Sequence, residues 1–352
     1  MSGNLENKFF KDINLNDPFF DTLKRDYETF ENWFLKKEDS TAYVHYNDNK
    51  SIDGFLYYKF EYGKVHDVTP EIIADKILKI GTFKINPHGS RLGERFIKKA
   101  LEYAVVNSAD ICYVTIFNRQ NTLIDLLKKY GFQESGRKVT KDGIETVLTR
   151  NMYEIKHDIC KDYPLINTRT GQKYLLGIYP KYHSKMFPDS ILTNENNRLI
   201  EDVSYTNSIH KHYVCSMYSA KKLKRGDLIV IYRTAPREAP SAEYTSVATS
   251  ICTVENIKYQ QDFNNFKQFY EYACKYSLFD EQDLYNWYQR GNCFIIKMLY
   301  NLALPKRITK HSLIEDVGIS RYTNYWGFVN LDKDMFNKIL GLGGVYESFI
   351  IN

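Results

Sequence analysis

A predicted strand, a glycine-containing turn and a predicted helix follow one another between residues 76 and 106, and this segment limits the possible folds more than any other. The apolar pattern of Lys76–Ile85 predicts a strand, and the apolar spacing of Leu92–Val106 predicts a helix. A turn that opens a helix presents unpaired backbone N–H groups, and the helix dipole favours an anion there. Gly89 and Gly93 would let the backbone approach a phosphate closely. The segment therefore predicts a pyrophosphate site, although most such turns are purely structural.

Further strands and a second helix surround this segment in an order that supports a ligand site. Polar turn residues separate the first two predicted strands, and a Tyr-Gly-Phe sequence ends the short amphipathic helix. The predicted strands are Thr41–Tyr46, Phe55–Glu61, Ile111–Phe117 and Thr146–Arg150, and the predicted second helix is Leu123–Lys129.

Residues 20–150 resemble the GNAT family of acyl-coenzyme A-dependent N-acyltransferases. The acetyl-CoA loop of that family falls on His88–Gly93, where Gly93 fits, although His88 stands where Arg or Gln is usual and Arg91 where Gly is usual. The Gly131-Phe132 pair matches a second signature. The resemblance implies acetyl-CoA or another acyl-CoA as cofactor. The residues that it implies for cofactor binding are Phe83, His88, Gly89, Ser90, Arg91, Leu92, Gly93, Glu94 and Asn118.

The catalytic residues of the family are matched less well. Leu127 stands where a Tyr often protonates the leaving thiolate, and Tyr130 is the nearest Tyr in sequence. The strand before the loop lacks a carboxylate over residues 80–84, so Glu61 is our candidate base, with Glu71 and Asp75 as alternatives. The resemblance thus implies an N-acetyltransferase that uses Glu61 and Tyr130. A CoA-binding fold with little turnover is the alternative.

Length, cysteine spacing and net charge limit the class of protein further. A length of 352 residues suggests two domains. The six cysteines are widely spaced without a Cys-x-x-Cys pair, which favours reduced thiols in a cytoplasmic protein over disulfides or a metal site. No apolar run approaches the roughly 18 residues that span a bilayer, so we expect no membrane partner. The net charge of +5 permits an anionic partner.

The second half of the chain has more predicted strands than helices. Residues 151–170 are polar and lack a clear period, so we expect a first domain over 1–150, a linker over 151–172 and a second domain over 173–352. The predicted strands are Lys173–Tyr179, Ile209–Met217, Leu228–Tyr232, Tyr244–Asn256 and Cys293–Leu299, and the predicted helices are Phe263–Tyr276, Ser312–Val317 and Lys333–Leu340.

Residues 173–340 resemble the PUA-like superfamily, which includes the ASCH, EVE and YTH groups. The resemblance is carried by the segments Tyr179–Pro188, Asn207–Cys215 and Lys224–Arg233, although the hallmark motif of the ASCH group is missing. It implies a small β-barrel with helices. The fold class expected for the whole chain is therefore α+β, with an N-terminal mixed sheet flanked by helices and this C-terminal barrel.

The same half carries candidate contacts for RNA, tRNA or modified DNA. Lys221, Lys222, Lys224 and Arg225 form a basic cluster that would neutralise phosphates, with a solvated turn as the alternative. An unpaired base would stack on aromatic or guanidinium groups, with core packing as the alternative. The residues considered for stacking are Tyr232 with Arg233, and Tyr325 with Trp326. His210 and His212 share one strand face but lack further ligands, so no metal is expected.

Together these patterns predict an N-acyltransferase that a nucleic-acid-binding domain directs to an amine on RNA or on a ribonucleoprotein. Fusions of this kind resemble prokaryotic toxin–antitoxin or stress-response proteins, in which a protein partner is also expected. The alternative is a catalytically weak regulatory module of a toxin–antitoxin or defence system that binds CoA and nucleic acid.

Overall fold

The computed structural model describes residues 5–47, 49–86, 91–187, 208–277 and 279–351. The chain divides into two compact units, Met1–Asp162 (unit 1) and Tyr163–Asn352 (unit 2). Both units combine strands and helices. Within the described residues, no helix is long and apolar enough to cross a membrane.

Unit 1 contains one mixed seven-stranded sheet in the order β1-β2-β3-β4-β5-β7-β6. Only β4 and β5 of this sheet pair in parallel. Its strands are β1 (Leu5–Phe9), β2 (Thr41–Tyr46), β3 (Ile52–Val65), β4 (Ile72–Ile85), β5 (Ile111–Phe117), β6 (Gln133–Thr140) and β7 (Gly143–Asn151). Its α-helices are α1 (Asp21–Asp26), α2 (Phe30–Leu35), α3 (Leu92–Val106) and α4 (Asn121–Lys129).

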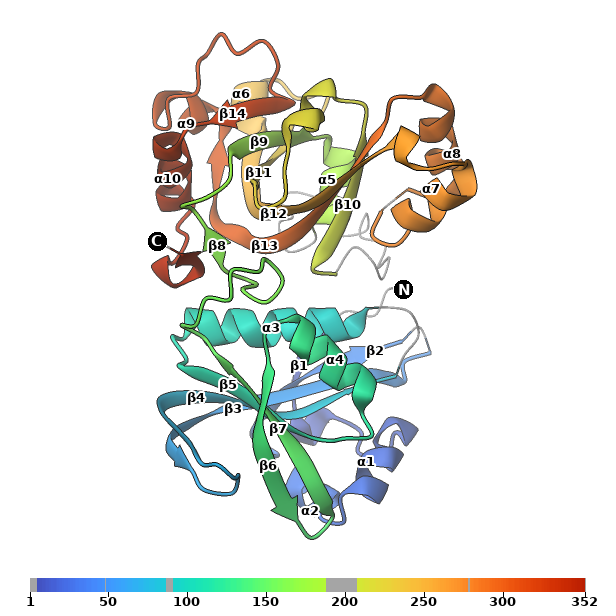
Figure 1. Ribbon diagram of the computed structural model, residues 1–352, viewed down its shortest axis with the longest axis vertical. Helices are drawn as coiled ribbons and strands as arrows, with labels where there is room; N and C mark the ends of the chain where they lie inside the picture. Colours follow the sequence, from blue (N-terminus) through green and yellow to red (C-terminus); the bar gives the residue numbers. More distant parts are fainter. Residues whose placement is uncertain (1–4, 48, 87–90, 188–207, 278, 352) are drawn as a thin grey trace. The chain divides into compact units, whose positions relative to one another are not determined.

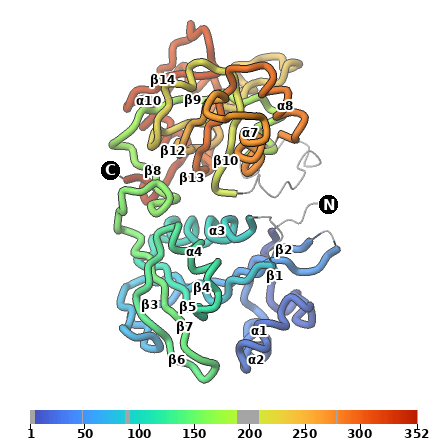
Figure 2. Tube along the Cα trace, turned by 45° about the vertical axis from the view of Figure 1, so that its right-hand side comes forward, coloured from blue at the N-terminus to red at the C-terminus, as the bar shows by residue number. Residues whose placement is uncertain are grey.

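Helices cover both faces of this sheet, as Figures 1 and 2 show. Helix α3 lies along one face, where the ring of Tyr103 is 4.7 Å from that of Tyr58, and α4 packs beside it. Helices α1 and α2 lie on the other face. There an aromatic cluster joins them to the sheet through Phe10, Phe34 and Phe55, all nearly inaccessible to solvent. The burial of these large rings holds α2 on the sheet, and Leu23 of α1 packs against the same cluster.

Unit 2 is built on a six-stranded sheet in the order β10-β13-β12-β11-β9-β14. A short parallel pair joins β8 (Ile166–Asn167) to β15 (Ile350–Ile351). The strands of the large sheet are β9 (Lys173–Ile178), β10 (His210–Cys215), β11 (Leu228–Arg233), β12 (Val247–Tyr259), β13 (Phe294–Thr309) and β14 (Phe328–Leu331). The α-helices are α5 (Pro180–Met186), α6 (Ala242–Thr245), α7 (Phe266–Ala273), α8 (Glu281–Arg290), α9 (Lys310–Glu315) and α10 (Lys333–Leu342).

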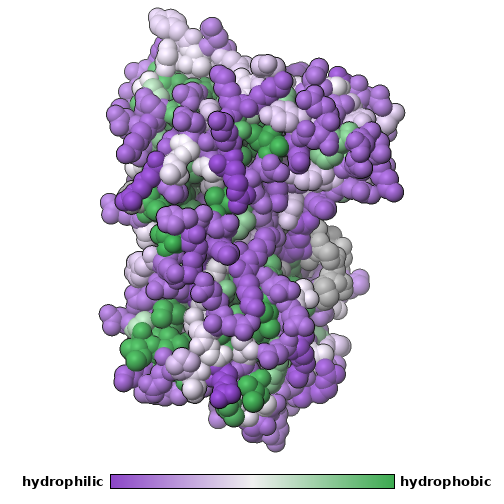
Figure 3. All heavy atoms as spheres, viewed as in Figure 1, coloured by the Kyte–Doolittle hydropathy of each residue, from purple (hydrophilic) through white to green (hydrophobic). Residues whose placement is uncertain are grey.

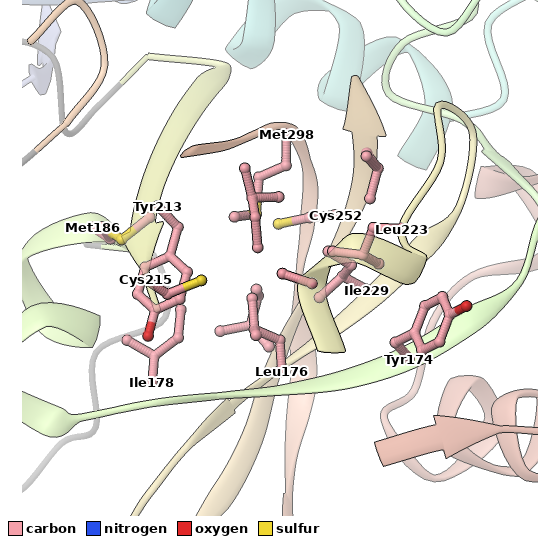
Figure 4. Close-up of a cluster of buried hydrophobic side chains, with 14 of the residues drawn as sticks. Tyr174, Leu176, Ile178, Met186, Tyr213, Cys215, Leu223, Ile229, Cys252 and Met298 are labelled. Carbon is pink, nitrogen blue, oxygen red and sulfur yellow. The ribbon is translucent and has the colours of Figure 1, made fainter. Parts of the chain in front are cut away.

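One hydrophobic core gathers side chains from both ends of this strand order (Figure 4). Leu176 on β9 and Tyr213 on β10 belong to the same cluster, together with Ile229 and Met298. The sheet therefore curls around its core, as a barrel does. Among the described residues, however, the edge strands β10 and β14 do not pair with each other. The expected closed barrel is thus an open, curled sheet, because no backbone ladder joins its two edges.

A buried ion network lies between α7 and the outer face of this sheet. Nδ1 of His210 is 2.7 Å from Oε2 of Glu255, and Nζ of Lys297 is 2.7 Å from Oε1 of the same carboxylate. His212 stacks on Tyr272 at 4.9 Å. Burial alone raises the pKa of Glu255, but its two partners outweigh burial and lower that pKa to about 2. The two histidines thus take part in packing and pairing within unit 2.

Several predicted elements are confirmed with unchanged bounds, among them α3 and β5. Others are longer than predicted: β13 continues to Thr309, well past the expected Leu299. Several elements were missed, among them the strands β1, β6 and β14 and the helices α1, α2 and α8. The segment expected as a linker contains β8, which belongs to unit 2.

We expect Glu255→Gln to lower the free energy of unfolding of unit 2 by about 2–3 kcal/mol at pH 7, because it removes a largely buried carboxylate that pairs with His210 and Lys297. A lowered pKa stabilises the fold above the ordinary carboxyl pKa, and this contribution is lost as the pH falls towards 2. The wild type should therefore lose more stability than the variant between about pH 4.5 and 2. Urea unfolding of the full chain across this range measures both quantities.

Glu243→Gln is the matched control, because Glu243 also pairs with a histidine and with an arginine but lies at the surface. It should change stability little. Equal effects of the two substitutions would contradict the buried-network interpretation.

Candidate functional site

The parallel strands β4 and β5 pair over a short stretch only. The register runs from Ile77 opposite Ile111 to Ile80 opposite Val114. Beyond this point β4 continues to Ile85 and β5 to Phe117 without pairing to each other. The two carboxyl ends therefore leave backbone groups outside the β4–β5 ladder, and the end of β4 precedes α3 in the chain.

A β-bulge marks the same point on the other edge of β4. Tyr58 pairs with Ile80 and Tyr57 pairs with Thr82, so Gly81 is an extra residue in β4. A Cβ atom at Gly81 would lie 2.9 Å from the Tyr57 ring. A side chain at this position would therefore clash, and the bulge re-aims the last residues of β4.

Helix α3 begins at the end of this strand. Arg91 precedes the helix with φ of 50°, in the left-handed region that residues other than glycine rarely adopt. Leu92 is buried against Gly54, where a Cβ atom would approach its Cδ2 to 2.4 Å. The first turn of α3 is thus held on the sheet by close packing. The predicted cofactor contacts His88, Gly89 and Ser90 lie outside the described residues.

Gly93 and Glu94 face the neighbouring helix α4. A Cβ atom on Gly93 would lie 2.7 Å from Cδ2 of Leu126. Oε1 of Glu94 is 3.1 Å from Nζ of Lys129. Both residues therefore dock α4 beside the start of α3, which is a packing role that the sequence pattern did not reveal. Their predicted contact with a cofactor stays a prediction.

Two other predicted cofactor residues lie at the carboxyl ends of the diverging strands. Phe83 on β4 packs edge-on against Phe96 of α3, with ring centroids 5.6 Å apart. Asn118 directly follows β5 and is exposed, and its side-chain oxygen accepts a hydrogen bond from Thr146. The structure thus brings Phe83, Arg91 and Asn118 to one end of the β4–β5 pair.

Glu61 lies at the opposite end of that pair, because it stands beside Ile77 in the register. It accepts a hydrogen bond from the hydroxyl of Tyr113 at 2.6 Å and forms an ion pair with Lys59 at 2.6 Å. Burial raises the pKa of Glu61, but these two partners, helped by the charge of Lys79, outweigh burial and lower it. A base needs a high proton affinity, so its predicted catalytic role finds no support in this environment.

Tyr130 is fully buried at the carboxyl end of α4. Its backbone oxygen accepts a hydrogen bond from Nη1 of Arg150 at 2.8 Å. Gly131 follows with φ of 86°, which turns the chain out of the helix. The Tyr-Gly-Phe sequence therefore ends α4 and fills the core, and the predicted role of Tyr130 as an acid stays a prediction.

A polar pair that the sequence analysis missed lies near the end of β5. The hydroxyl of Tyr27 donates a hydrogen bond of 2.6 Å to Oε1 of Glu145, which is buried. Glu145 stands opposite Phe117, the last residue of β5, and the Tyr27 ring packs on Phe117 at 5.1 Å. Burial and the hydrogen bond to Glu145 raise the pKa of Tyr27, so this phenol stays protonated.

The predicted nucleic-acid residues of unit 2 fall into an exposed and a buried group. Lys221, Lys222, Lys224 and Arg225 are exposed around a 3₁₀ turn (η6, Tyr218–Lys222) and the loop before β11. Tyr232 and Arg233 are buried at the end of β11, and the ring of Trp326 packs on Tyr232 at 5.6 Å. The buried ring faces of Tyr232 are taken up by packing, which favours the alternative that the sequence analysis held open.

Among the described residues, one group has the donor atoms of a metal site. Ligand atoms of Glu243, His311 and Glu315 lie within 4.8 Å of one another. Arg321 already pairs with both carboxylates, at 3.3 Å from Glu243 and 2.5 Å from Glu315. The chain itself therefore supplies a cation to this group.

No family model matches the chain, and no curated protein matches it. Among solved structures, the chain is similar to a mutant ASCH protein from Zymomonas mobilis (10% identity, 49% of this chain and 96% of that chain, TM-score 0.33). It is also similar to Naa20 of Chaetomium thermophilum in complex with a bisubstrate analogue (13%, 42% and 86%, TM-score 0.33). A third similar structure is a GNAT-family acetyltransferase from Listeria monocytogenes (16%, 42% and 94%, TM-score 0.31). At these identities and TM-scores no function passes to this chain.

We expect Gly131→Ala to destabilise unit 1 strongly, because a Cβ atom there would lie 2.5 Å from the backbone oxygen of Lys161 in addition to the strained φ. Gly63→Ala is the matched control, since Gly63 has φ of 75° with open space around it. The control should lose about 1–2 kcal/mol from the strained φ alone, and Gly131→Ala about 1–3 kcal/mol more. Urea unfolding of the two variants measures the difference, and equal losses would contradict the packing described for this turn.

Proposed function

We propose that unit 1 is an acyl-CoA-dependent N-acyltransferase, with acetyl-CoA as the first candidate donor. The observation that carries the proposal is that β4 and β5 stop pairing before their carboxyl ends, and that α3 is the next element of the chain after the end of β4. In sheets with parallel strands, ligands bind beyond the carboxyl ends of neighbouring strands. The unpaired N–H groups of the first turn of α3 add an anion site at the same place.

The chain offers groups for each part of such a donor. The first-turn N–H groups of α3 and the Arg91 guanidinium suit the pyrophosphate of CoA. Gly81 lies in the bulge of β4, where backbone groups outside the ladder suit the pantetheine amides and the acyl carbonyl. When bound, the thioester supplies an activated acyl group. The protein would hold the thioester and the acceptor amine close together in the correct orientation. Such positioning accounts for a large share of this kind of catalysis.

The acceptor amine would approach from the face that carries α1 and α2. Tyr27 and Glu145 lie there beside Phe117 at the end of β5. A buried carboxylate near the reaction centre stabilises an ammonium group, and it positions the amine before its proton is lost. Glu145 is therefore a stronger candidate for the amine side than Glu61, which lies at the other end of the strand pair.

The acceptor that we propose is an amine on RNA or on a ribonucleoprotein, which unit 2 would bring to the enzyme. The exposed lysines of the 3₁₀ turn η6 and of the loop after it support this proposal, since cations on one turn favour a polyanion. Mass spectrometry of tRNA, ribosomes and lysine peptides incubated with the protein and acetyl-CoA tests it. Acetyl transfer to one of these substrates is the expected result. Tight binding of acetyl-CoA without transfer to any of them would favour the alternative, a regulatory CoA-binding module.

Arg91→Ala should weaken acetyl-CoA binding about tenfold, because it removes a charged hydrogen-bond donor from the proposed pyrophosphate site. Isothermal titration of the full chain with acetyl-CoA measures the change. Lys99→Ala removes the same charge eight residues further along α3 and should leave the affinity nearly unchanged. No binding by the wild type, or equal losses in both variants, would contradict the proposed donor site.

A further inference from the structure

A cavity of about 500 Å³ lies in unit 2, at the end of β10, the end of β12 and the start of β13. This volume falls in the range of sites that hold small organic ligands, roughly 300–1,000 Å³. The lining residues are Ser216, Tyr218, Lys221, Tyr259, Gln260, Gln261, Phe263, Tyr288, Asn292, Cys293 and Phe294. Aromatic rings, amides and one lysine therefore meet at a single cavity.

The inner wall of this cavity is held in place by the core. The Tyr259 ring packs edge-on against Phe294 at 5.4 Å, and the Tyr288 ring lies 5.3 Å from Phe269. The Gln260 side chain donates a hydrogen bond of 2.6 Å to the Tyr288 backbone oxygen, and its own oxygen accepts one from the Cys293 N–H at 3.4 Å. Gln260 thereby joins the end of α8 to the start of β13, so the inner wall of the cavity is preformed.

The outer rim differs from the inner wall, because its groups are exposed. The Tyr218 side chain is 76% exposed, and Nζ of Lys221 lies over its ring at 4.5 Å. Ser216, Gln261 and Asn292 are also exposed at the cavity. An exposed ring beside hydroxyl and amide groups suits a flat aromatic ligand that has hydrogen-bonding edges.

Lys221 is the one charged side chain among the described residues that line this cavity, and the exposed Lys222 and Lys224 follow it in the chain. Among the residues that the structure describes, no carboxylate pairs with Lys221, Lys222 or Lys224. Figure 3 shows a largely hydrophilic surface over the neighbouring helices α7 and α8. Free cations at the edge of an aromatic cavity attract an anionic group attached to the aromatic ligand.

We propose that this cavity binds a nucleotide, with its base stacked on Tyr218 and its phosphate on Lys221. The ligand is either a free mononucleotide or one residue of a single strand whose backbone follows Lys222 and Lys224. This inference rests on the proposed function in one respect, because the cavity would give unit 2 a contact for the proposed RNA substrate. It also relocates base stacking from the buried Tyr232 to an exposed ring of the same unit.

Fluorescence anisotropy of a labelled 12-nucleotide single-stranded RNA with all four bases tests this site in the full-length protein. Tyr218→Ala should weaken binding about tenfold or more, and Tyr218→Phe should restore it because stacking needs only the ring. Lys221→Ala should weaken binding and reduce the dependence on salt by about one phosphate contact. Tyr322→Ala and Lys306→Ala, which alter exposed residues that do not line the cavity, are the controls.

Competition by AMP, GMP, CMP and UMP separates the two sources of the nucleotide. Displacement of the RNA by one mononucleotide assigns the site to a free nucleotide, and failure of all four, with Tyr218 still required, assigns it to a strand. The inference is overturned if neither RNA nor mononucleotide binds, or if Tyr218→Ala and Tyr322→Ala bind RNA equally well. Acetyl-CoA titration of Tyr218→Ala should match the wild type, so a failed donor site and a failed nucleotide site give different results.

Discussion

The organisation of unit 1 depends on the short parallel pairing of β4 with β5. Parallel neighbours require a crossover connection, and here α3 supplies it. Because the pairing ends after Ile80 and Val114, the crossover starts from strand ends that no longer share a ladder. Close packing at Gly54 and Gly93 then holds α3 on the sheet and α4 beside α3. The proposed donor site is a consequence of this arrangement, since strand ends and a helix start come together there.

The sheet of unit 2 packs differently from the sheet of unit 1. It curls around one apolar core, so most strand positions on that side are buried. On the outer face Glu255 pairs with His210 and Lys297. His212 links α7 to the sheet through the Ala273 backbone oxygen and the Tyr272 ring. The cavity lies where β12 ends and β13 begins, and residues of η6 and α8 also line it. The Tyr218 ring at this cavity is exposed, whereas Tyr232 is buried in the core. A binding role therefore suits Tyr218 better than it suits Tyr232.

Strong local patterns allowed part of this fold to be predicted. The bounds of α3 and β5 follow from their apolar periodicity, which no competing local signal obscures. The strand β6 was missed because it is a polar edge strand, and α8 because its sequence is mostly polar with only Leu284 fully buried. The sequence pattern predicted that Gly93 contacts a ligand. It could not predict the close approach of Gly93 to Leu126, because that approach depends on tertiary packing. The pair of Tyr27 and Glu145 joins residues 118 positions apart, which no local pattern predicts.

The central claim is that the diverging ends of β4 and β5, with the start of α3, form the donor site. Hydrogen–deuterium exchange of the full chain with and without saturating acetyl-CoA tests it most directly, because it locates the ligand without assuming an acceptor. We predict slower exchange in peptides that cover residues 81–97 and unchanged exchange throughout unit 2. Unchanged exchange over residues 81–97, or protection confined to other parts of the chain, would contradict the account.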